Sequence, residues 1–188
     1  MDSISQIFLR AKHWQIFSLL LGTYALSVLT TTKLSPKLKP GIEHNPTGLI
    51  LLIAAGIAPY ILSNFAWLRA AALLFNANLK PELQLRTGFF HFAIVYAVLG
   101  FVFGLPFSWA SNQIQQRWWP LPEFFGLICM IYILNFTAKA FVTLGRGRLS
   151  RPWNYGGKTI EFLIPALFVW TIQPRINQLY AAGQKQVA

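Results

Sequence analysis

Five stretches of this chain are long, apolar and nearly free of charged side chains. They cover about residues 14–32, 48–75, 88–110, 123–144 and 159–176. A helix needs about 20 mostly apolar residues to cross a bilayer, and it satisfies its own backbone polar groups there. The pattern therefore predicts an all-α, polytopic transmembrane bundle of five helices. Because Pro165 interrupts the last stretch, four spanning helices plus a re-entrant segment is the alternative.

The composition agrees with a membrane protein. Hydrophobic residues make up 55% of the 188 residues and charged residues only 11%, whereas a soluble domain carries about 25% charged residues. The connections between the stretches are too short to hold a second domain, so we expect a single transmembrane domain over residues 1–188. The first stretch has 19 uncharged residues, which is longer than the apolar core of about 7–15 residues in a signal peptide.

Basic residues outnumber acidic residues by 16 to 5, which gives a net charge of +11. They lie scattered between the apolar stretches, where they act as topology signals and headgroup anchors, so we expect no binding to nucleic acid. With five spanning helices, nine Lys and Arg fall on the amino-terminal side and six on the other. If the fifth stretch does not cross, the balance is eleven against four. Both counts predict a cytoplasmic amino terminus.

Polar side chains gather in the inner half of the expected bundle. This expected polar cluster consists of Asn64, His91, Asn135, Lys139 and Glu161. Polar groups are costly in a bilayer, so they face the interior of a bundle. We expect an ion pair between Lys139 and Glu161, since a carboxylate offsets the cost of an intramembrane ammonium. The cluster is either a structural feature or a pocket for a headgroup, an ion or a small molecule.

Small residues recur on one face of the third stretch, at Ala93, Ala97, Gly100 and Gly104. Small side chains let two helix backbones approach closely. The stripe therefore predicts helix packing, either within the bundle or at the seam of a homo-oligomer.

Two groups of residues indicate the membrane surface. The connection after the fourth stretch carries Arg146, Arg148 and Arg151, which predicts contact with anionic lipid headgroups or, alternatively, a plain topology signal. The tryptophans, Trp67 among them, lie where interfacial aromatic belts are expected.

Signals for catalysis and for cofactors are weak. The only Asp is Asp2 in the amino-terminal tail, which leaves no Ser-His-Asp triad, and no phosphate-binding Gly-rich loop is present. His13 and His91 lack the usual spacing of metal or haem ligands. We therefore expect no catalytic residue, no metal and no cofactor.

Two segments near the carboxyl end carry a resemblance. They are Ala138-Lys139-Ala140-Phe141 and the run from Trp170 to Asn177, which reads WTIQPRIN. They resemble a group of small, uncharacterised, Bacteroidetes-type integral membrane proteins. The resemblance covers the last quarter of the chain and implies a bacterial inner membrane, with no assigned activity and no functional residues.

The leading functional hypothesis is non-enzymatic. It is a small integral membrane protein that binds a lipid, a small molecule or a partner helix, or that serves as a component of a membrane complex. Its expected partners are membrane lipids, a second copy or another membrane subunit. One alternative is a channel or transporter lined by Lys139, Glu161, Asn64 and Asn135. The other is a lipid-modifying membrane enzyme with His91 and Glu161 as acid and base.

Overall fold

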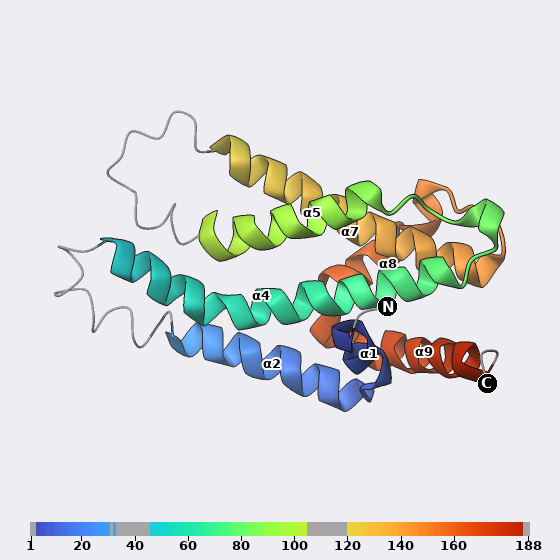
Figure 1. Ribbon diagram of the computed structural model, residues 1–188, viewed down its shortest axis with the longest axis horizontal. Coiled ribbons are helices and arrows are strands. Elements are labelled where there is room, and N and C mark those ends of the chain that lie inside the picture. The colour runs from blue at the N-terminus through green and yellow to red at the C-terminus, as the bar shows by residue number, and fades with distance from the viewer. Residues whose placement is uncertain (1–2, 31, 33–45, 105–119, 186–188) are drawn as a thin grey trace.

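The computed structural model describes residues 3–30, 32, 46–104 and 120–185. Seven α-helices and two short turns account for most of these residues, and none of them forms a strand. The α-helices are α1 (Ser3–Arg10), α2 (His13–Leu29), α4 (Pro46–Ala77), α5 (Gly88–Leu99), α7 (Pro120–Arg146), α8 (Pro152–Leu163) and α9 (Pro165–Lys185), as Figure 1 shows. The turns are a 3-10 turn, η2 (Pro81–Leu83), and a π-helical turn, η3 (Gly100–Gly104), which extends α5.

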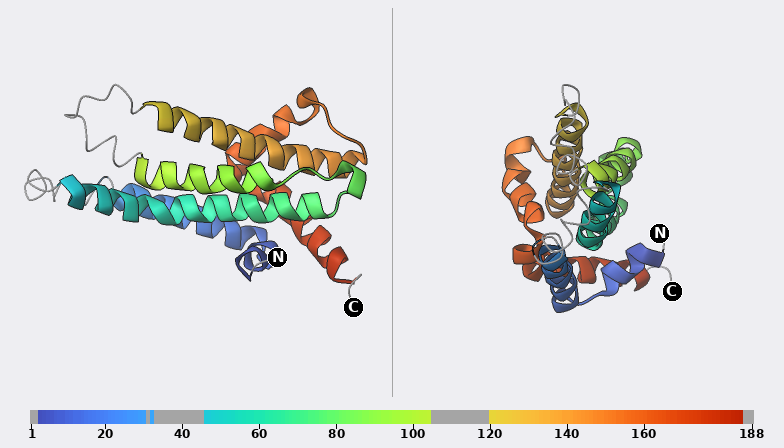
Figure 2. Two further views of the ribbon diagram at one scale, coloured as in Figure 1. Left: turned by 45° about the horizontal axis from the view of Figure 1, so that its top comes forward. Right: turned by 90° about the vertical axis from the view of Figure 1, so that its left-hand side faces the viewer.

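Four helices run along the long axis of the molecule with α4 at their centre. α4 contacts α2, α5 and α7 (Figures 1 and 2). Ala70, Ala71 and Ala72 of α4 are fully buried, and such small side chains allow neighbouring helices to approach closely. Phe75 packs edge-on against Phe141 of α7, with the ring centroids 5.1 Å apart. The core therefore combines small side chains with aromatic rings in edge-to-face contact.

Two of the described helical segments are long and apolar enough to cross a bilayer. They are Ala54–Ala77 and Phe124–Arg146, and the segments His13–Leu29 and Gly88–Gly104 are apolar but shorter. The all-α prediction is confirmed. Of the five expected membrane spans, these two meet the criterion of length and composition, which weakly supports membrane association.

The fifth expected helix, over 159–176, is divided in two. α8 ends at Leu163, Ile164 has φ −118° and ψ 65°, and α9 begins at Pro165. The break has a direct cause, because a proline disfavours the helical conformation of the residue before it. α8 packs along α7, and α9 turns back beside α2 and α1. The end of α9 lies at the same end of the bundle as the α7–α8 connection (Figures 1 and 2).

A buried polar node ties α9 to the rest of the fold. Gln173 is fully buried, and its side-chain Oε1 accepts the indole N–H of Trp67 at 2.8 Å. Its Nε2 lies 2.9 Å from the carbonyl of Phe8 and 3.0 Å from that of Ala11, where α1 ends. Carbonyls at a helix end lack partners within the helix, so this side chain caps α1. The expectation that Trp67 belongs to an interfacial belt is wrong, since it is 1% exposed.

Candidate functional site

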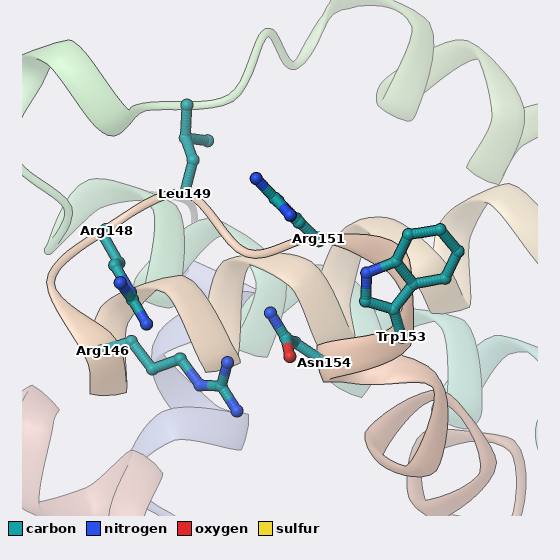
Figure 3. Close-up of a pocket in the computed structure, with 6 residues that line it drawn as sticks. All are labelled: Arg146, Arg148, Leu149, Arg151, Trp153 and Asn154. Atoms are coloured by element: carbon teal, nitrogen blue, oxygen red, sulfur yellow. The ribbon is translucent and has the colours of Figure 1, made fainter.

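A basic basin lies at the connection between α7 and α8 (Figure 3). Its volume is about 500 Å³. Its lining consists of three arginines, two large apolar side chains and one amide: Arg146, Arg148, Arg151, Leu149, Trp153 and Asn154. The three arginines are those predicted from the sequence to meet lipid headgroups, and the structure places them around one space.

Thr143 fixes the loop that carries the arginines. The backbone N–H of Gly147 donates to the Thr143 carbonyl at 2.9 Å, and Gly147 has a φ of +64°. Only glycine adopts this left-handed conformation without steric cost, and it ends α7 there. The N–H of Ser150 then donates to the Thr143 hydroxyl at 3.3 Å. Thr143 accepts both bonds and is fully buried, so the bundle holds the backbone between Arg146 and Arg151.

The electrostatics of the basin favour an anion. No carboxylate is found among its described lining residues. Each guanidinium presents five N–H donors that fit two oxygens of a phosphate or carboxylate at once. The amino terminus of α8, which begins at Pro152, adds the positive end of a helix dipole. In Figure 3, Arg146, Arg148 and Asn154 extend toward a common space.

Two large apolar side chains flank this polar space. Trp153 is 82% exposed and Leu149 is 54% exposed. Exposed apolar groups beside a cationic cluster are typical of a surface that contacts the boundary between lipid headgroups and acyl chains. The basin can therefore bind an oxyanion and contact apolar material at its rim.

The five residues of the expected polar cluster do not converge on one site. Asn135 and Lys139 line a common pocket. Asn64 instead donates to the Tyr60 carbonyl of its own helix at 2.9 Å. His91 is exposed near the start of α5, and neither it nor Glu161 lines that pocket.

The expected ion pair between Lys139 and Glu161 is wrong. The Nζ of Lys158 lies 2.6 and 2.8 Å from the two carboxylate oxygens of Glu161. The two residues are three positions apart on α8, so the helix itself brings them together and no tertiary contact is needed. In the part of the chain that the structure describes, Lys139 takes part in no ion pair. The pattern of Lys158 and Glu161 at positions i and i+3 was the sequence signal for the true pair.

The two halves of the predicted small-residue stripe differ in burial. Ala93 and Ala97 are fully buried in the bundle, as internal helix packing requires. Gly100 and Gly104 are partly exposed, and a Cβ added at either would meet nothing within 4 Å. The tightest approach that the structure describes at a glycine lies elsewhere, at Gly56. An added Cβ there would lie 2.5 Å from Thr30 Cγ2.

Among the described residues, no group of three His, Cys, Asp or Glu side chains is placed to hold a metal ion. Comparison with protein-family models, with curated proteins and with solved structures gives no match. A function for this protein is therefore argued from the geometry of the site.

Proposed function

We propose that this protein is a non-enzymatic, integral membrane protein that binds anionic phospholipids through the basic basin. In this proposal α2, α4, α5 with η3, and α7 cross the membrane. α8 and α9 form a re-entrant hairpin that enters and leaves on the side of the basin, which in a bacterial inner membrane is the cytoplasmic side.

The outer surface of the bundle supports the membrane assignment. On α5, Phe90 and Ala93 are buried, while Phe92 and Val95 on the opposite face are exposed and equally apolar. A helix on the surface of a soluble protein carries polar residues on its outer face, whereas a helix that is apolar all round lies in a core or in a membrane. α2 and α7 show the same pattern, with exposed residues such as Leu21 and Ile131.

The distribution of charge supports the orientation. The loops at the basin end and the adjoining helix ends hold Lys80, Arg86, Arg146, Arg148 and Arg151 among their described residues. With a re-entrant hairpin, eleven Lys and Arg of the full chain fall on this side and four on the other. An excess of Lys and Arg marks the cytoplasmic side of a membrane protein.

The observation that carries the lipid-binding proposal is that three arginines line one basin, with exposed Leu149 and Trp153 at its rim. The arginines match the phosphate of a lipid, and the rim matches the apolar region just below it. Binding of a free phosphate would not require the two apolar side chains at the rim. Arginines that act only as a topology signal would not need to line a common basin.

A lipid titration tests the proposal. The protein in detergent is titrated with phosphatidylglycerol or phosphatidylcholine, and retained lipid is counted by native mass spectrometry. Arg146→Gln/Arg148→Gln is compared with Lys12→Gln/Lys80→Gln, which removes two charges at exposed positions outside the basin. We expect the basin variant to bind phosphatidylglycerol about tenfold more weakly, the equivalent of losing one charge-assisted hydrogen bond. Equal losses in both variants would show unspecific charge attraction and refute the proposal.

A further inference from the structure

A second pocket, here called the Lys139 pocket, lies where the end of the α4–α5 connection meets α7 and α8. Its volume is about 340 Å³, within the range of small-ligand sites. The side chains that matter for its chemistry are those of Arg86, Tyr132, Asn135, Phe136, Lys139 and Tyr155. It shares no described lining residue with the basic basin.

The polar groups of the Lys139 pocket are mainly donors. Lys139 and Arg86 supply two cations, and Tyr132 and Tyr155 supply phenolic hydroxyls. The Oδ1 of Asn135 already accepts the hydroxyl of Thr159 at 3.1 Å, which leaves its amide nitrogen as a donor. A site built this way lacks a negatively charged hydrogen-bond acceptor of its own.

The lining of the pocket supplies no such acceptor. No lining residue that the structure describes is acidic. The carboxylate that the sequence pairs with Lys139, that of Glu161, is bonded by Lys158 on both oxygens. Lys139 is only partly exposed and sits within a segment apolar enough to span a membrane. An ammonium in that setting is costly unless an anion accompanies it.

The position of Lys139 along α7 sets the depth of the site. Lys139 lies seven residues before Arg146, at the end of α7, which corresponds to about 10 Å along the helix axis. Phe136 and Tyr132 lie one and two turns deeper. Phe136 stacks on Phe90 at 4.4 Å, and Tyr132 meets Phe89 edge-on at 4.8 Å. With α7 crossing the membrane as in the proposed function, on which this step rests, the pocket is cationic near the surface and aromatic toward the centre of the membrane.

The fold also fixes the loop that carries Arg86. Asn76, at the end of α4, accepts the backbone N–H of Leu85 at 2.7 Å and donates to the Leu85 carbonyl at 3.0 Å. Asn76 is 8% exposed. Two hydrogen bonds to a buried side chain hold the backbone next to Arg86, so the bundle fixes the point from which this cation reaches the pocket.

We infer that the Lys139 pocket binds the phosphate of an anionic amphiphile, as a second site independent of the basic basin. The phosphate lies between Lys139 and Arg86 and accepts from the Asn135 amide. The apolar part follows Phe136 and Tyr132 toward the bilayer. A membrane phospholipid and a soluble phosphate ester share the phosphate chemistry, and the aromatic wall favours the lipid.

The test uses the full chain in detergent and compares Lys139→Met with Lys80→Met, an exposed lysine outside the pocket. Each is titrated with phosphatidylglycerol and, separately, with inorganic phosphate, and binding is followed by native mass spectrometry and by the melting temperature. We expect Lys139→Met to lose one bound phosphatidylglycerol, with an affinity drop of about tenfold, and Lys80→Met to bind like the natural chain. Arg86→Gln changes an exposed side chain, so it tests the same site should Lys139→Met fail to fold.

The outcomes separate the two sites and the two sources. If only the Arg146→Gln/Arg148→Gln variant loses lipid, the basin stands and the Lys139 pocket is refuted. If only Lys139→Met and Arg86→Gln lose lipid, the Lys139 pocket stands and the basin fails. Stabilisation by inorganic phosphate that Lys139→Met abolishes, without any effect of phosphatidylglycerol, would identify a soluble phosphate as the ligand. Unchanged binding of both probes in folded Lys139→Met and Arg86→Gln would overturn the inference.

Discussion

Trp67 and Gln173 lie 106 residues apart in the chain and share a buried hydrogen bond of 2.8 Å. The bond joins the centre of α4 to α9, and the same amide reaches the end of α1. Neither side chain is more than 1% exposed. Three elements that the sequence separates thus depend on one glutamine, which stands directly before Pro174 in the segment WTIQPRIN.

Gln173→Leu should destabilise the fold strongly. Leucine has a similar volume but leaves the Trp67 indole N–H and the Phe8 carbonyl buried without partners. Each such group costs about 1–3 kcal/mol, so we expect the free energy of unfolding to fall by about 2–4 kcal/mol. Unfolding by SDS titration from mild detergent micelles measures this. The control is Gln178→Leu, at an exposed position of the same helix, and equal losses in both variants would contradict the role of the node.

The sequence predicts the all-α class and the helices α2, α4, α5 and α7 because their signal is local. A long apolar run and a proline decide where a helix begins or ends, and the break before Pro165 follows from that residue alone. The same holds for the three arginines of the basin, which are close together in the chain. Pairings between distant segments carry no such signal. The sequence around Gln173 carries no sign that this side chain is buried, and only the packing of α9 against α4 and α1 shows it.

The same difference between local and long-range signals holds for the site residues. Asn135 and Lys139 are four residues apart on one helix, and they do share a pocket. The expected cluster includes Asn64, His91 and Glu161 because the sequence predicts a similar depth in the membrane for all three. Depth fixes the position along the bundle axis but leaves the direction of a side chain around its helix open. Arg86 is not predicted from the sequence because it lies in a connection, and only the fold, in which Asn76 holds the neighbouring Leu85, places it at the pocket.

Gly56→Ala should weaken the contact between α2 and α4. A Cβ at Gly56 would lie 2.5 Å from Thr30 Cγ2, and the Gly56 carbonyl accepts the Ser27 hydroxyl at 2.8 Å. The added Cβ would also lie 2.7 Å from Thr30 Cβ, an atom that no change of rotamer moves, so the helices must shift apart. Such overpacking costs about 1–3 kcal/mol. The melting temperature in detergent measures the loss. Gly22→Ala on α2 is the control, because its Cβ would meet nothing within 4 Å, and it should be neutral or slightly stabilising. A neutral Gly56→Ala would show that the two helices are not in close contact.

Glu161→Gln should have little effect on stability. Its partner Lys158 is on the same helix, and the side chains are 21% and 39% exposed. A solvated pair of this kind contributes less than about 1 kcal/mol. Chemical denaturation of Glu161→Gln beside Lys139→Met checks this. A loss of about 3–5 kcal/mol on Glu161→Gln would instead indicate a buried ion pair. A double-mutant cycle of Glu161 with Lys139 would then show whether Lys139, and not Lys158, is the partner.

Thiol labelling should place both ends of the α8–α9 hairpin on one side of the membrane. The native Cys129 is fully buried, so it gives little background with a membrane-impermeant maleimide, and the natural chain serves as the control. Leu149→Cys reports on the basin, Gln178→Cys on the far part of α9, and Thr32→Cys on the opposite end of the bundle. All three positions are exposed. Because α9 turns back at Ile164, we expect the cysteines at 149 and 178 to react in inverted vesicles and the one at 32 to react in intact spheroplasts. If the cysteine at 178 reacted together with the one at 32, α9 would cross the membrane, and eleven cations could no longer lie on the side of the basin.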